Sequence, residues 1–314
     1  MSRVRLLVDP VRQPGARRLA AWLDALLDGG PPPRGGVVAR IRRRIGKGSA
    51  PWVDIGWPPR GAPLLVPTGP PPTGIPPTVR AVLALTPEAA EALRTSPAPA
   101  AAVMPAPYPV PTVFYAPGDT RLVHRASRDL RLHERPRLVY LGPYDDGRAL
   151  TRALDTARRL LATSGELVLP GSLPWRAGLA PVVARLGLAE RVVFTPPLDD
   201  ALWAGVLLGA DLALAPARPD GVWPVEWLPV LAAGLPLVAA DGPLTRQVAG
   251  TAALLVDPGR DEVWPEAART VLYRERVRTE LAARALARAA EFHEDEARAA
   301  WRAAVDRWIA PGSA

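Results

Sequence analysis

Two glycine-ended turns and one acidic loop hold the residues of this chain that could do chemistry. Gly142 ends the apolar run RLVYLG, Gly171 ends the run ELVLPG, and Arg148 stands shortly after the first turn. The loop RPDGVWPVE carries Asp220 and Glu226. In an open α/β sheet, ligands bind outside the carboxyl ends of the strands, and an anion there is held by backbone N–H groups and an arginine or lysine. These turns predict an anion site; the alternative is a solvated helix start and a polar surface loop.

Several common kinds of catalytic site are excluded. The chain has no cysteine, which removes disulfides, thiol catalysis and cysteine-ligated zinc. Its three histidines, His124, His133 and His293, are far apart in sequence, so a histidine-rich metal site is not expected. There is no G-x-S-x-G motif, IGKGS has Gly after Lys where a Walker loop requires Ser or Thr, and LGPYDDG lacks G-x-G-x-x-G. A nicotinamide-binding domain is therefore disfavoured.

The net charge of +8 and the pI of about 10.7 predict an anionic partner. That partner could be a nucleotide, a nucleic acid or an anionic membrane surface. Alternatively, the positive charge reflects only arginine in place of lysine on an ordinary protein surface. We expect no nucleic acid, because no motif for it is present. The densest basic stretch, residues 39–49, is either a membrane-facing patch or a solvated face.

Nothing in the sequence predicts insertion into a membrane. The longest apolar runs are interrupted well short of the roughly 18 residues of a spanning helix, and the first residues lack the apolar core of a secretion signal. We expect a cytoplasmic protein, with peripheral contact at the inner face of the membrane as an alternative. The absence of Asn and Cys, with 39 prolines, suits a thermophile, and a GC-rich genome explains the composition equally well.

The second half of the chain alternates between apolar runs and helical periods. The runs are almost continuously apolar, which is typical of strands buried on both faces of a parallel sheet. Six strands are predicted, in the segments RLVYLG, ELVLPG, RVVFTPP, DLALAPA, LPLVAAD and AALLVDPG. Helices are predicted over Ala149–Ala162, Ala177–Leu186, Asp200–Ala210, Val230–Ala233, Arg274–Phe292 and Glu296–Ile309. This order predicts a doubly wound domain with helices on both faces of the sheet.

The first half is interrupted by prolines and also alternates strands with helices. Its predicted elements are strands at Val4–Val8, Trp52–Ile55, Leu64–Val66, Val79–Leu85 and Ala101–Met104, and helices at Ala16–Leu27 and Pro87–Arg94, the second with Thr86 as its N-cap. Residues 105–136 are rich in proline and charge, which is typical of a junction, although a long loop within one domain is an alternative. We predict an N-terminal domain over residues 1–120, a linker over 121–136 and a C-terminal domain over 137–296.

Short motifs of the second half resemble those of family-four glycosyltransferases, in the same order. The segment GLAERVVFTPPLDDALWAGVLLGADLALAPA is similar to the family's G-L-x-x-R-V-x-F-x-G-x-V, a helix and A-D-x-x-x-x-P-S. The segment LAAGLPLVAADGPLTRQVAGTAALLVDPG is similar to its A-x-x-G-x-P-V-V-A-x-D … G-x-A-x-L-V-x-P. The N-terminal half matches loosely and is short for the family's acceptor domain.

The resemblance implies an α/β protein with the GT-B fold, in which two Rossmann-like, doubly wound parallel-sheet domains face each other across a cleft. It implies a retaining glycosyltransferase that moves a hexosyl group from a nucleotide diphosphate sugar to a hydroxyl acceptor. It implies no metal and no cofactor beyond that donor. It also implies that the last helix, residues 297–314 with Trp301 and Trp308, packs back onto the N-terminal domain.

The family motifs further imply roles for individual residues. Asp220 is expected to be the catalytic-site carboxylate that holds the sugar, and Glu226 to hold the ribose hydroxyls. The expected donor-binding residues are Gly142, Arg148, Gly171, Thr195, Pro196, Leu198, Gly221 and Glu226. The first three would bind the diphosphate, and the segment from Thr195 to Leu198 would bind the base through its backbone.

Several positions depart from the family pattern. Pro143 stands where the family has a phosphate-binding arginine, and the second Glu of the Glu-x7-Glu motif falls on Pro229. Ala217 and Arg246 replace a serine and a glutamate, and Thr68 stands near the expected N-terminal histidine. These departures favour a second hypothesis, a degenerate glycosyltransferase-like protein that binds a ligand or partner without catalysis. A third, a binder of anionic surfaces or nucleic acid, rests on charge alone.

Overall fold

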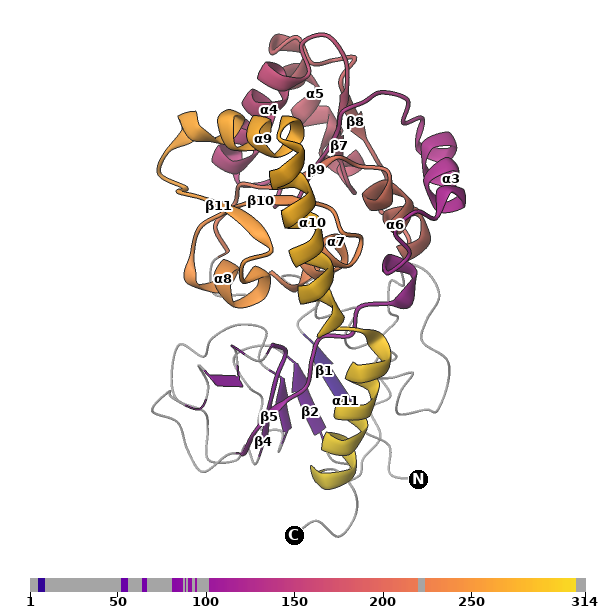
Figure 1. The fold of residues 1–314 in the computed structure, drawn as a ribbon, viewed down its shortest axis with the longest axis vertical. Coiled ribbons are helices and arrows are strands. Elements are labelled where there is room, and N and C mark those ends of the chain that lie inside the picture. Colours follow the sequence, from indigo (N-terminus) through magenta and orange to yellow (C-terminus); the bar gives the residue numbers. More distant parts are fainter. Residues whose placement is uncertain are drawn as a thin grey trace. The chain divides into compact units, whose positions relative to one another are not determined.

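The structure is a computed structural model that describes residues 5–8, 52–55, 64–66, 81–86, 88, 90, 91, 94, 102–219 and 224–308. The predicted helix at 16–27, the basic stretch at 39–49 and the positions Thr68, Asp220 and Gly221 lie outside these residues. The chain divides into two compact units (Figure 1). The first unit holds Met1–Val110, Asp220–Glu226 and Glu291–Ala314, and the second holds Pro111–Pro219 and Trp227–Ala290.

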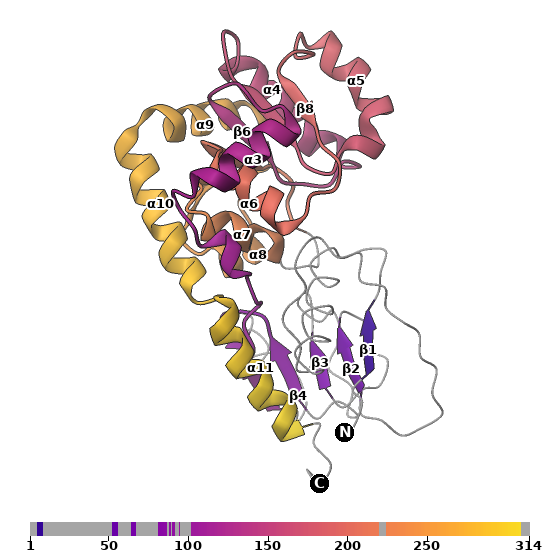
Figure 2. The same cartoon turned by 90° about the vertical axis from the view of Figure 1, so that its right-hand side faces the viewer.

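Five short parallel strands form the sheet of the first unit. They pair in the order β1 (Arg5–Val8), β2 (Trp52–Ile55), β3 (Leu64–Val66), β4 (Ala81–Ala84) and β5 (Ala102–Pro105). Figure 2 shows β1 to β4 side by side and pointing the same way. Val82, Leu83 and Ala84 are all fully buried, so β4 is covered on both faces of the sheet.

The last helix of the chain, α11 (Glu294–Trp308), contacts the segment that follows β5. The indole of Trp301 is fully buried, and its Nε1 donates a hydrogen bond of 2.9 Å to the carbonyl oxygen of Pro107. The backbone N–H of Val110 donates to the carbonyl of Phe292, just before the helix begins. A buried indole needs a partner for its N–H, and the Pro107 carbonyl supplies it.

Six parallel strands form the sheet of the second unit, which confirms the doubly wound arrangement predicted for it. They pair in the order β11 (Ala253–Val256), β10 (Leu237–Ala240), β9 (Leu212–Ala215), β6 (Arg137–Tyr140), β7 (Glu166–Leu169) and β8 (Val192–Phe194). The chain runs from β6 outward to β8, returns to the other side of β6 at β9, and continues to β11. The direction therefore reverses between β6 and β9, and this reversal is the topological switch point of the sheet.

Helices connect these strands: α4 (Gly147–Leu160), α5 (Arg176–Arg185), α6 (Asp200–Leu208), α7 (Leu228–Ala232) and α8 (Pro243–Ala249). Helices α9 (Trp264–Tyr273) and α10 (Glu275–Ala290) follow β11. Because parallel crossovers are right-handed, the reversal at β6 and β9 places α4 and α5 on one face of the sheet and α7 and α8 on the other.

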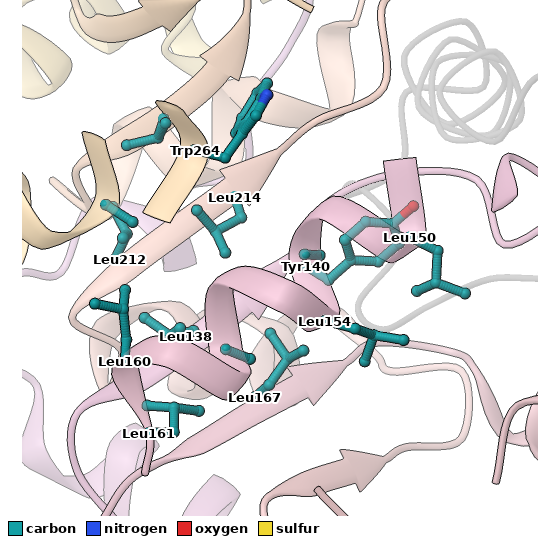
Figure 3. Packing of buried hydrophobic residues seen from close by; sticks show 14 of the residues in the cluster. Leu138, Tyr140, Leu150, Leu154, Leu160, Leu161, Leu167, Leu212, Leu214 and Trp264 are labelled. Carbon is teal, nitrogen blue, oxygen red and sulfur yellow. The ribbon is translucent and has the colours of Figure 1, made fainter. Parts of the chain in front are cut away.

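One hydrophobic core fills the space between the sheet and the helices α4 and α9 (Figure 3). Leu138 of β6 and Leu212 and Leu214 of β9 point into it, and Leu160 of α4 and Trp264 of α9 cover them. The alternate residues of β9 follow the period of two expected of a strand. Helix α9 was not predicted from the sequence; its residues Trp264, Ala268, Val271 and Leu272 are buried on one face.

The region predicted as a linker contains a helix, and this prediction was wrong in that respect. Helix α3 (Thr120–Leu130) belongs to the second unit and packs on α6. The two helices meet so closely that a Cβ on Gly205 of α6 would lie 2.3 Å from the carbonyl oxygen of Leu122 of α3. The carboxylate of Asp119 caps the helix by accepting from the backbone N–H of Arg121 at 2.9 Å. Its apolar residues Leu122, Ala126 and Leu130 recur every four residues, a helical spacing that the sequence contains, although only Ala126 is buried.

A buried ion pair joins β6 to β7 near their amino ends. Nε of Arg137 lies 2.5 Å from Oε1 of Glu166, and each side chain is 4% exposed. Oε2 of Glu166 accepts from the backbone N–H groups of His133 and Glu134 at 3.2 and 3.3 Å. Nη1 of Arg137 donates to the carbonyl of Gly209 at 3.1 Å. These four contacts therefore join the amino ends of β6 and β7 to the segments that precede β6 and β9.

Candidate functional site

The candidate site is the carboxyl edge of the second unit's sheet, centred on the switch point. The loop after β6 begins at Leu141, and the loop after β9 begins at Pro216. These two strands are direct neighbours in the sheet, so their loops leave it side by side. An open α/β sheet binds its ligands at such a point.

The loop after β6 is built around a buried tyrosine. The hydroxyl of Tyr140 donates to the carbonyl of Pro143 at 2.8 Å, and burial raises the pKa of that hydroxyl. A Cβ on Gly142 would lie 2.7 Å from the Tyr140 hydroxyl, so the loop can cross the ring only because Gly142 has no side chain. Pro143 itself is exposed.

The start of α4 is already capped by a carboxylate. Oδ1 of Asp146 accepts from the backbone N–H groups of Arg148 and Ala149 at 3.1 and 3.0 Å. These are N–H groups that an anion at this helix end would otherwise use. Any contact of Arg148 with an anion at this edge must therefore come from its side chain.

Two arginines on α4 share one carboxylate. Nη2 of Arg148 lies 3.4 Å from Oδ2 of Asp261, with both side chains exposed, whereas Nε of Arg152 lies 2.5 Å from Oδ1 of the same residue. The hydrogen bond from Arg152 is the main cause that lowers the pKa of Asp261. The side chain of Arg152 is 6% exposed and also donates to the carbonyls of Pro216, at 3.3 Å, and Pro258. Arg152 thus ties together the loops that follow β9 and β11.

The loop after β9 carries a further arginine. Arg218 is exposed, and its side chain lies over Gly242, which ends the loop after β10: a Cβ on Gly242 would be 3.5 Å from Nε of Arg218. Nearby, Nη2 of Arg246 pairs with Oδ2 of Asp241 at 2.6 Å. Arg246 thus has a carboxylate partner of its own.

The loops after β7 and β8 bring Gly171 and Thr195 together. The backbone N–H of Gly171, which has a φ of +68°, donates to Oγ1 of Thr195 at 3.0 Å, and that hydroxyl donates to the carbonyl of Pro196. The backbone N–H of Thr195 donates to Leu169 and its carbonyl accepts from Leu173. Thr195 is buried, so it fixes the loop, whereas Pro196 is exposed and Leu198 is half-buried.

Two aromatic side chains, Tyr144 and Trp175, lie near the carboxyl ends of β6 and β7. Trp175, in the 3-10 helix Leu173–Trp175, is 46% exposed, and its ring centroid lies 6.2 Å from that of Tyr144. The hydroxyl of Tyr144 donates to the carbonyl of Pro170 at 2.7 Å, and burial raises its pKa. Tyr144 therefore holds one loop against the other.

The acidic loop is described only at its end. Glu226 is exposed and lies in the 3-10 helix Val225–Trp227, which the division of the chain splits between the two units. Helix α7 starts at Leu228, and Pro229 within its first turn is buried. Glu226 therefore precedes the helix, as the sequence predicts, and a side chain at position 229 points into the protein.

Of the predicted site residues, the structure gathers Gly142, Arg148, Gly171, Thr195, Pro196 and Leu198 on the carboxyl edge of one sheet. Three residues of this edge were not predicted from the sequence: Arg152, Arg218 and Asp261. Arg152 follows Arg148 by four residues and so shares its helix face, a spacing visible in the sequence. Asp261 carried no such signal, because it is brought there from beyond β11.

The described part of the chain shows no candidate metal centre and no helix that could span a membrane. No group of three or more His, Cys, Asp or Glu side chains there could hold a metal ion. No helix in the same part is long and apolar enough to cross a bilayer.

Comparisons with known proteins find similarity of fold. No family model and no curated protein matches the sequence. Sucrose-phosphate synthase from Thermosynechococcus elongatus aligns with a TM-score of 0.57 and 21% identity, over 73% of this chain and 58% of that one. Anabaena HepE in complex with UDP and glucose aligns with a TM-score of 0.60 and 15% identity, over 73% and 63%. A glycosyltransferase from Rickettsia africae gives a TM-score of 0.66 and 9% identity, over 82% and 76%.

This likeness establishes the fold class predicted from the sequence. The chain is an α/β protein with the GT-B fold of these structures. It spans less than two thirds of the length of the first two proteins.

Proposed function

We propose that the chain is a divergent member of glycosyltransferase family four that binds a nucleotide diphosphate sugar at the carboxyl edge of the second sheet. In this proposal a hexosyl group passes to a hydroxyl acceptor with retention of configuration. The observation that supports it most is the switch point between β6 and β9, with its arginine-bearing loops, in a chain whose fold is that of HepE, a protein described in complex with UDP. The acceptor, and peripheral contact with an anionic membrane, remain part of the proposal.

In this proposal, side chains stabilise the negative charge of the leaving diphosphate, and the backbone N–H groups at the start of α4 do not. As the glycosidic bond breaks, negative charge develops on the leaving diphosphate, and fixed cations stabilise it best. The Arg148 side chain can reach such an anion because its bond to Asp261 is long and exposed, and exposed pairs of this kind are weak.

The base is assigned to the loop after β8. The hydroxyl, N–H and carbonyl of Thr195 are all engaged within the protein, and Pro196 and Pro197 have no N–H. In our proposal, Thr195 therefore holds the loop rigid, and the backbone N–H of Leu198 is the donor toward the base. Gly171, whose N–H is held by Thr195, keeps the loop open by its left-handed conformation.

The acidic residues complete the proposal. Asp220 and Gly221 belong to the sugar subsite, and Glu226 accepts hydrogen bonds from the ribose. On this assignment, Asp220→Ala lowers turnover by about 100-fold, because positioning of the reacting carbon is worth several kcal/mol. Glu226→Ala weakens nucleotide binding by about 10-fold, the value of one charge-assisted hydrogen bond.

A binding protein without catalysis is the second candidate function. Two observations favour it: Pro229 is buried where the family has its second glutamate, and Arg246 is paired with Asp241 where the family has another. Both positions lack the carboxylate that the family motif places there.

Thermal unfolding with UDP, GDP and ADP, followed by donor hydrolysis and transfer assays, tests the proposal. A ligand at about 100 times its Kd contributes about 2.7 kcal/mol to the native state, which raises Tm by several degrees. Binding with turnover that Asp220→Ala abolishes supports the enzyme, and binding without turnover for any donor supports the second candidate. If none of the three diphosphates shifted Tm at millimolar concentration, the nucleotide site itself would be rejected.

A further inference from the structure

We propose that Arg218 is the principal cation for the donor's diphosphate in this chain. This inference rests on the proposed function and deepens it. Pro143, after β6, stands where the family motif has its phosphate-binding arginine. In this inference, an arginine after the neighbouring strand β9 binds the diphosphate instead. Nothing in the sequence motifs marked this residue.

The position of Arg218 suits that task. It stands three residues beyond the end of β9, on the strand that borders β6 at the switch point. Its side chain extends toward the end of β10, since a Cβ placed on Gly242 would lie 3.5 Å from its Nε. The guanidinium is therefore placed outside the carboxyl ends of adjacent strands, where a ligand of an open α/β sheet binds.

Other arginines of this edge already have carboxylate partners. Arg152 is buried and is held by Asp261 and two carbonyls, and Arg246 is paired with Asp241 at 2.6 Å. Arg148 keeps a long, exposed contact of 3.4 Å with Asp261, so it is a second cation beside Arg218. Within the described ranges, the Arg218 side chain has neither a hydrogen bond nor an ion pair. Its five N–H donors are therefore free for the fork-like, bidentate contact that phosphate oxygens favour.

The loop that carries Arg218 is held at its base. Nη1 of Arg152 donates to the carbonyl of Pro216, two residues before Arg218. The buried guanidinium of Arg152 requires hydrogen-bond partners, and the Pro216 carbonyl is one of them. This bond holds the backbone of the loop two residues before Arg218. A cation on an anchored loop loses less freedom on binding than one on a free loop.

The test compares three variants for binding of a nucleoside diphosphate and of its nucleoside. The probes are UDP, GDP and ADP with uridine, guanosine and adenosine, measured by isothermal titration calorimetry on the full chain. We expect Arg218→Gln to raise the Kd of the best-bound diphosphate by about 10- to 100-fold, the range for a lost charge-assisted contact, and to leave the Kd of the nucleoside within about 2-fold. Arg218→Lys, which keeps the charge but not the fork, should restore part of the affinity.

Arg246→Gln is the matched control, because it removes an equal charge from an exposed arginine of the same edge that has its own carboxylate partner. The inference is overturned if Arg218→Gln binds the diphosphate as tightly as wild type, if Arg246→Gln loses as much, or if the nucleoside loses affinity equally. In each of these cases wild type still binds a nucleoside diphosphate, so the proposed function survives. If wild type binds none of the three diphosphates, the proposed function fails and this inference fails with it.

Discussion

Removing one partner of the buried pair of Arg137 and Glu166 should strongly destabilise the second unit. Glu166→Ala leaves the guanidinium of Arg137 buried with the Gly209 carbonyl alone and removes the acceptor of two backbone N–H groups. Breaking one side of a buried pair costs about 3–5 kcal/mol, because the remaining charge is uncompensated. For a unit of this size, a loss of about 4 kcal/mol lowers Tm by roughly 10 °C.

The assay is chemical denaturation of the full chain, followed by far-UV circular dichroism, for wild type and four variants. Glu166→Gln keeps the volume and one acceptor oxygen, so it should lose less than Glu166→Ala. The pair Arg137→Met with Glu166→Leu removes both charges and should recover part of the loss, since two apolar groups leave no charge unpaired. Glu280→Ala removes the exposed partner of Arg276 and should leave the free energy of unfolding unchanged. A loss below about 1 kcal/mol for Glu166→Ala would refute the reasoning, since the cost of a buried, unpaired charge would then be absent.

The remaining predictions concern packing and pH. Gly205→Ala should lower the free energy of unfolding by about 1–3 kcal/mol, the range for overpacking, because its Cβ would meet the backbone of α3 at Leu122. Gly147→Ala is the control, because a Cβ at Gly147 would lie in open space. Equal losses of stability in the two variants would contradict the close approach of α3 to Gly205. Asp261 has a folded pKa below its unfolded value, so the stability it contributes is present above the unfolded pKa and is lost as the pH falls through the folded pKa. The difference in unfolding free energy between wild type and Asp261→Asn should therefore be constant at neutral pH and shrink in acid; a difference that grew in acid would reverse the assigned sign.

Much of the fold could be predicted from local patterns. The segments around Leu138, Leu167 and Leu212 are apolar without alternation, which indicates strands covered on both faces and hence a parallel sheet. The helices α3 and α9 were not predicted, although the sequence carries a signal for each. Asp119 precedes α3 as an N-cap, and the buried Trp264, Ala268 and Val271 of α9 stand at helical spacing.

The sequence by itself determined which residue types follow each strand of the second sheet: Gly142 after β6, Gly171 after β7 and Thr195 after β8. Only the tertiary structure decided which of their groups are free. Asp146 occupies the first N–H groups of α4, Thr195 occupies the N–H of Gly171, and Arg152 is held by Asp261 from 109 positions along the chain. A periodic pattern reports the face on which a side chain lies, but a hydrogen-bond partner is chosen by distance in space, and the partners here come from loops that meet only when the sheet is assembled.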